Sequence, residues 1–101
     1  MRLSKMYNLF ITEKAQKQVL KLSEEDAQHV KEVISLCLGK YLKKPSKRCN
    51  KKLLEGSKYE TYRLHVSMTH TVFYRIDEIE KRVIVIEVRG INQAHSKYGV
   101  F

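Results

Sequence analysis

The chain has few of the features that mark a membrane protein. The apolar run that follows its basic N-terminal start is only three residues long, Leu9 to Ile11. That is too short for a membrane span or for the core of a signal peptide. We therefore expect a cytoplasmic protein that makes no membrane contact. There is also no internal repeat or low-complexity segment.

Cysteine is scarce, and its spacing argues against metal or redox chemistry. The only two, Cys37 and Cys49, are twelve positions apart and lack the close pairing of a zinc knuckle or a CxxC motif. Cytoplasmic disulfides are rare. We expect Cys37 to lie in the apolar stripe of a helix and Cys49 to be a loop thiol. No disulfide, metal site or cofactor is expected.

Acidic residues are also few compared with basic ones. Eleven Asp and Glu face twenty Lys and Arg, so the net charge of +9 attracts polyanions, whether nucleic acid or an anionic membrane. The segment from Lys40 to Lys52 is rich in lysine and contains no acidic residue. It either contributes to binding a polyanion or is simply a solvated connection. With 101 residues, 43% of them hydrophobic, the chain fits one globular domain spanning residues 1–101.

The apolar periodicity predicts a strand, two helices and then several strands. Thr12 and Ser23 are candidate helix caps, and Gly39 is a natural helix stop. The expected elements are a strand at 7–11, helices at 13–22 and from 23 to 39, and strands at 52–54, 59–66, 72–76 and 82–89. This is an α+β fold of order β-α-α-β-β-β, in which a helical hairpin covers one face of an antiparallel-rich sheet.

Strand alternation also predicts the pairing register. A three-residue connection, residues 67–69, sets Leu64 opposite Val72 and Arg63 opposite Phe73, whereas a two-residue turn would pair His65 with Val72. The inward set then contains Tyr62, Leu64, Val66, Val72, Tyr74 and Ile76. In the last strand the same logic points Ile84, Ile86 and Val88 inward.

The remaining strand residues define a polar open face. It carries Arg63, His65, Phe73, Arg75, Glu87 and Arg89, with Val85 beside them, and is bordered by the lysine-rich segment and by residues 95–98. Guanidinium groups bind phosphate, aromatic rings stack on bases and imidazole moves protons near neutral pH. That combination favours single-stranded RNA. The alternative is a charged, solvated sheet face on which Glu87 pairs with a neighbouring arginine.

An ordered series of short motifs runs through the second half of the chain: Lys52-Leu53-Leu54-Glu55-Gly56, Tyr62-Arg63-Leu64-His65-Val66, Val72-Phe73-Tyr74-Arg75-Ile76, Arg82-Val83-Ile84-Val85-Ile86 and His95-Ser96-Lys97-Tyr98. In this order they resemble the RelE/ParE toxin superfamily. The resemblance implies a sheet curved around a helical hairpin. It also implies the toxin of a type II toxin–antitoxin system, with an antitoxin protein as partner.

RelE-type toxins cleave messenger RNA on the ribosome without a metal, by attack of a ribose 2′-hydroxyl on the adjacent phosphate. Carried over to this sequence, Arg63 would hold the phosphate, His65 would act as general base, and His70 and Tyr98 would complete the catalytic set. RNA contacts would come from Lys52, Phe73, Arg75, Arg89, His95 and Lys97.

The connection from Ser67 to His70 departs from the family pattern, because it lacks the turn glycine and the second arginine. Two other functions fit the same resemblance. One is a ParE-like inhibitor that binds DNA gyrase, and the other is a degenerate member that binds only its antitoxin.

Overall fold

The structure, a computed structural model, describes residues 7–55, 60–66 and 69–90. Its elements are β1 (Asn8–Ile11), α1 (Glu13–Leu20), α2 (Glu24–Ser35), a π-helical turn η1 (Leu36–Lys40), β2 (Asn50–Leu53), β3 (Tyr62–Val66), β4 (His70–Asp77) and β5 (Arg82–Gly90). The sheet order is β1-β5-β4-β3-β2. β1 runs parallel to β5, and the other neighbours are antiparallel. The predicted α+β class and element order are confirmed.

Both helices begin at the predicted caps. The hydroxyl of Thr12 accepts a hydrogen bond from the backbone N–H of Ala15, and that of Ser23 accepts one from Asp26, both at 3.1 Å. α1 ends two residues earlier than predicted, although Leu22 still packs against the core. α2 was expected to stop at Gly39, but helical structure continues through η1 to Lys40.

A lysine side chain closes the end of this helical segment. Lys51 Nζ donates to the carbonyl oxygens of Cys37 at 3.3 Å and Leu42 at 3.0 Å, and also to that of Tyr41. The last carbonyls of a helix have no partner within the helix, so the ammonium group satisfies that of Cys37 and joins it to the two residues that follow η1. Burial, helped by the nearby charge of Lys43, lowers the pKa of Lys51.

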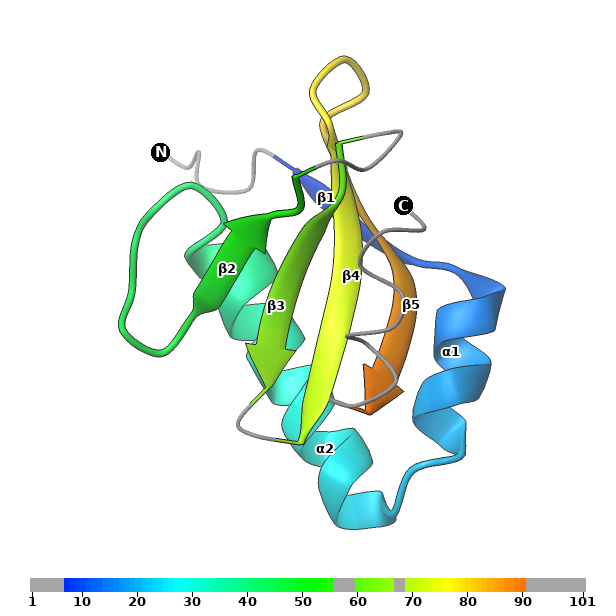
Figure 1. The fold of residues 1–101 in the computed structure, drawn as a ribbon. Coiled ribbons are helices and arrows are strands. Elements are labelled where there is room, and N and C mark those ends of the chain that lie inside the picture. Colours follow the sequence, from blue (N-terminus) through cyan, green and yellow to red (C-terminus); the bar gives the residue numbers. More distant parts are fainter. Residues whose placement is uncertain (1–6, 56–59, 67–68, 91–101) are drawn as a thin grey trace.

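The predicted register of the central hairpin is correct. Leu64 pairs with Val72 and Arg63 with Phe73, while the pairing of Val66 with His70 leaves residues 67–69 as the connection. Figure 1 shows the strands curving across the front of the molecule, with α2 behind them and α1 beside β5. Of the helices described, none is long and apolar enough to cross a membrane.

The predicted facing of β5 is wrong over its first half. The β4–β5 register shifts between Phe73, which pairs with Glu87, and Tyr74, which pairs with Val85. Such a bulge places two successive residues of one strand opposite one position of the other and inverts the alternation. Val85 therefore points into the core and Ile86 does not, whereas Val88 points inward as predicted.

The main core lies between the helices and the sheet. Its buried members include Ala15, Val19, Val30, Ile34 and Leu38 from the helical segments, and Leu64, Val66, Val72, Tyr74, Val83, Val85 and Val88 from the strands. The ring of Tyr74 stacks on that of Tyr62, with 5.3 Å between the centroids. Burial, with a smaller contribution from Tyr62, raises the pKa of Tyr74 well above its usual value.

The expectation that the cysteines stay unpaired is also wrong. Cys37 and Cys49 form a disulfide, with their Cα atoms 5.5 Å apart. The lysine-rich loop returns its far end to the C-terminal end of the helical segment, so two residues distant in sequence come within bonding reach. Cys49 is consequently buried, at 8% exposure, and is no loop thiol.

Candidate functional site

The sheet face opposite the helices gathers polar side chains in two rows. Because paired residues of neighbouring strands point to the same side, one row runs Asn50, His65, Thr71, Arg89 and the next runs Lys52, Arg63, Phe73, Glu87. We call these eight residues, with Arg75, the Arg63 face. Its strands β2, β3, β4 and β5 lie side by side in Figure 1.

Arg63 is held at the β2 side of this face. Its Nη1 donates to the side-chain oxygen of Asn50 at 3.2 Å and to the backbone oxygen of the same residue at 3.3 Å. Both bonds use one nitrogen of a guanidinium that has five N–H donors. Lys52 is its cross-strand partner and is exposed, so two positive charges lie next to each other.

His65 lies in the neighbouring row and is half-buried. Its Nδ1 lies 2.9 Å from the hydroxyl of Thr71, its partner on β4, which is itself fully buried. This contact fixes the orientation of the ring. Arg63 and His65 are two positions apart on β3, so their side chains emerge on the same side of the sheet. A group that can bind phosphate thus lies on the same face as a group that can accept a proton.

A buried carboxylate lies at the β5 side of the face. Glu87 is only 5% exposed and accepts from Arg89 Nε at 2.7 Å, while Lys14 Nζ on α1 lies 3.3 Å from its other oxygen. Burial alone would raise the pKa of Glu87, but the hydrogen bonds from Arg89 and Lys14 outweigh it and lower the pKa. The pairing of Glu87 with a neighbouring arginine is thus present.

Solved structures of toxins share this architecture. A RelE–RelB complex from Pyrococcus horikoshii OT3 has a TM-score of 0.66 at 16% identity, covering 84% of this chain and 94% of that one. The toxin–antitoxin complex RelBE2 from Mycobacterium tuberculosis gives 0.63 at 21%, covering 83% and 96%. A YafQ mutant from Escherichia coli gives 0.65 at 16%, covering 87% and 97%.

This chain has the RelE/ParE toxin fold. No known family's sequence model and no curated protein sequence matches it, so the likeness is carried by the three-dimensional structure. The resemblance read from the motif order is therefore confirmed at the level of fold.

Within this RelE/ParE fold, two of the predicted RNA-contact residues, Phe73 and Arg75, lie on the predicted side of the sheet but are not fully exposed. Phe73, expected on an open surface, is fully buried at 0% exposure, because it packs with Leu54 and Ile86 in a second small apolar cluster. Its ring is not exposed for stacking on a base. Arg75 is half-buried and donates from Nε to the hydroxyl of Thr61 at 3.2 Å.

His70 lies on the opposite side of β4 from the Arg63 face. It pairs with Val66 and Gly90, and its Nδ1 lies 2.9 Å from the hydroxyl of Thr69. The three predicted residues of the C-terminal segment, His95, Lys97 and Tyr98, fall outside the described residues. Of the four predicted catalytic residues, the structure therefore brings together Arg63 and His65.

Sequence reasoning missed Asn50, the residue that orients Arg63. The expected short strand began at residue 52, so Asn50 was assigned to the loop. The signal was nevertheless present: β2 keeps alternation with β3, and a polar residue two positions before Lys52 shares its face. Sequence reasoning also missed the roles of Thr61 and Thr71 as partners of Arg75 and His65.

The lysine-rich loop and the start of β2, residues 40–52, contain some cations that bind other groups of the protein and others that are exposed. Lys51 donates to the carbonyls of Cys37, Tyr41 and Leu42, and Lys43 Nζ pairs with Glu78 at 2.7 Å. Lys44, Lys47 and Arg48 are exposed. In the described part of the chain, no group of three His, Cys, Asp or Glu side chains is arranged to hold a metal ion.

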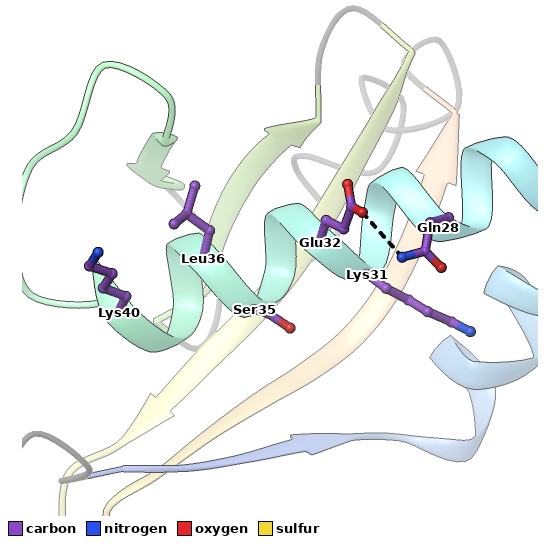
Figure 2. Close-up of a pocket in the computed structure, with 6 residues that line it drawn as sticks. All are labelled: Gln28, Lys31, Glu32, Ser35, Leu36 and Lys40. Atoms are coloured by element: carbon purple, nitrogen blue, oxygen red, sulfur yellow. Dashed lines mark hydrogen bonds between the residues drawn. The ribbon is translucent and has the colours of Figure 1, made fainter.

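A shallow depression lies on the outer side of the helical segment, away from the Arg63 face (Figure 2). It is lined by Gln28, Lys31, Glu32, Ser35, Leu36 and Lys40. Gln28 Nε2 donates to Glu32 Oε2 at 3.2 Å across it. Its lining includes no arginine and no histidine, so the Arg63 face is the better candidate for binding a phosphate and moving a proton.

Proposed function

We propose that this protein is the toxin of a type II toxin–antitoxin system and that it cleaves messenger RNA bound to the ribosome. The observation that carries the proposal is the juxtaposition of Arg63, His65 and Lys52 on one face of a RelE/ParE fold. Two cations beside an imidazole suit a phosphodiester whose neighbouring 2′-hydroxyl must lose a proton.

The reaction follows from these groups. A ribose 2′-hydroxyl attacks the adjacent phosphorus while His65 accepts its proton, and the bond from phosphorus to the 5′-oxygen breaks. Arg63 and Lys52 stabilise the negative charge that accumulates on the phosphate oxygens. The leaving oxygen needs a proton donor, a role for which the sequence motif offers Tyr98 and His95. No metal is needed in this scheme.

An antitoxin is the proposed protein partner. The Pyrococcus and Mycobacterium structures are complexes of a toxin with its antitoxin. A chain of net charge +9 favours a partner that contributes acidic residues. Co-expression with the product of the adjacent gene should yield a complex that survives purification and relieves growth arrest.

Induction of the protein in growing cells, followed by mapping of transcript ends, tests the nuclease activity. Wild type should arrest growth and create new ends within translated messages. Arg63→Ala and His65→Ala should each reduce cleavage by about a hundredfold or more. Lys17→Ala, which removes an exposed cation from α1, is the matched control and should cleave normally.

The same experiment separates the two alternative functions. Growth arrest without new transcript ends, with DNA damage that persists in His65→Ala, would contradict cleavage and favour a gyrase inhibitor. Antitoxin binding with no growth effect at all would identify a chain that only binds its antitoxin.

A further inference from the structure

The disulfide joins the helical layer to the strand that orients Arg63. Cys37 lies in η1, and Cys49 is the residue immediately before β2. These are the only two cysteines in the sequence, so neither has another partner within the chain. The bond therefore fixes where the lysine-rich loop ends and where β2 begins.

β2 has few other attachments. It is a four-residue strand at one end of the sheet, and among the strands that the structure describes it pairs only with β3. We call the hydrogen bonds from Lys51 Nζ to the carbonyls of Cys37, Tyr41 and Leu42 the Lys51 clamp. This clamp anchors Lys51, the second residue of β2, and the disulfide anchors Cys49, the residue before β2. Short edge strands with few buried contacts open more easily than the central strands of a sheet.

The first residue of β2 is Asn50, whose side-chain and backbone oxygens both accept from Arg63 Nη1. Cys49 and Asn50 are joined by one peptide bond, so any movement of the Cys49 backbone also displaces these two acceptor oxygens. Cys37 and Cys49 are themselves members of the main core, but α1, α2 and the central strands also pack there through many other residues. A change at the disulfide is therefore expected to act on the adjoining β2 before it disturbs the rest of the core.

We propose that Cys37 and Cys49 form a thiol switch, in which the disulfide holds β2 and Asn50 in place to orient Arg63, and reduction loosens them. The switch itself is a structural property. Only its effect on RNA rests on the function proposed above.

The exchange chemistry follows from the burial of the two sulfurs. Cys37 is 0% exposed and Cys49 is 8% exposed, so we expect an external thiolate to attack at Cys49 in preference to Cys37. It forms a mixed disulfide with Cys49 and releases Cys37 as a thiolate. A second external thiol then releases Cys49 and leaves as the external disulfide. Two electrons enter the protein, and the reverse exchange with a low-molecular-weight disulfide restores the bond.

Amide hydrogen exchange on the oxidised and reduced protein tests the switch directly. In the reduced protein, the amides shared by β2 and β3 should exchange on the order of tenfold faster, while those between β4 and β5 keep their protection. The Cys37→Ala/Cys49→Ala double variant should behave like the reduced protein with or without dithiol. If that variant does not fold, wild type in a graded thiol–disulfide buffer gives the same comparison.

Affinity for a short single-stranded RNA, measured on the same samples, supplies the functional readout. We expect reduction to weaken binding by about fivefold to tenfold, the effect of misplacing one charged hydrogen-bonding group. Unchanged β2 exchange after both thiols are shown to be free would overturn the switch. Faster β2 exchange with no RNA binding in either state would support the switch and contradict the proposed function.

Discussion

At the scale of single residues, Glu87 is nearly buried and yet charged. Two cations, Lys14 from α1 and Arg89 from its own strand, compensate for the lost hydration. Because they lower the pKa of the folded carboxyl below the ordinary 4.5, the ion pairs add stability at pH above that value. This contribution is lost as the pH falls through the folded pKa.

Replacement of Glu87 by glutamine should therefore lower the free energy of unfolding by about 1–3 kcal/mol at pH 7. The difference between wild type and variant should shrink as the pH is lowered below about 4. Urea denaturation at several pH values measures it. Glu60→Gln, an exposed carboxylate, is the control and should have little effect at any pH. A difference that stays constant with pH would mean that the charge of Glu87 is not what stabilises the fold.

At the scale of elements, the end of the helical segment depends on a residue from a strand. Lys51 donates to the carbonyl of Cys37 in η1 and to those of Tyr41 and Leu42, which follow η1. It also ties β2 to η1, so the clamp and the disulfide act on the same junction.

Lys51→Met keeps most of the side-chain stem but removes the ammonium group. We expect a loss of about 1–3 kcal/mol in unfolding free energy, since several charge-assisted hydrogen bonds are lost. Thermal and urea denaturation check this, with Lys47→Met in the exposed loop as the matched control. Equal stability of the two variants would show that the clamp is dispensable.

Elements differ in how well the sequence predicts them. Thr12 and Ser23 begin helices because their side chains cap locally, and Leu64 finds Val72 because the central strands alternate clearly. β5 does not alternate: residues 83–86 are all apolar, so either facing is acceptable and the bulge has no local signal.

Some residues of the candidate site could also be placed from the sequence, and others could not. The alternation of β3 puts Arg63 and His65 on one face from sequence alone. The burial of Phe73 could not be predicted, because it depends on the approach of Ile86 from β5 and of Leu54, the residue after β2. Nor could the disulfide, because a spacing of twelve does not reveal that the loop returns to its start.

At the scale of the whole molecule, the net charge of +9 makes a prediction about salt. Neutralising Lys44, Lys47 and Arg48 together with alanine should reduce the slope of log affinity for single-stranded RNA against log salt by about 2, if each contacts a phosphate. The control is a triple alanine variant of three exposed lysines, Lys17 on α1, Lys21 directly after α1 and Lys31 on α2. Equal slopes for the two variants would mean that overall charge, and not the loop, attracts RNA.

The parallel pairing of β1 with β5 has a consequence for synthesis. Thr12 bonds to Ile86, 74 positions later in the chain, and Gln18 accepts from the backbone of Val88. At about 5–20 residues per second, a ribosome needs roughly 4–15 seconds to make that intervening stretch. Until β5 emerges, β1 has no neighbouring strand and Glu87 has not joined Lys14. The β5 side of the Arg63 face, with Glu87 and Arg89, is therefore completed only late in translation.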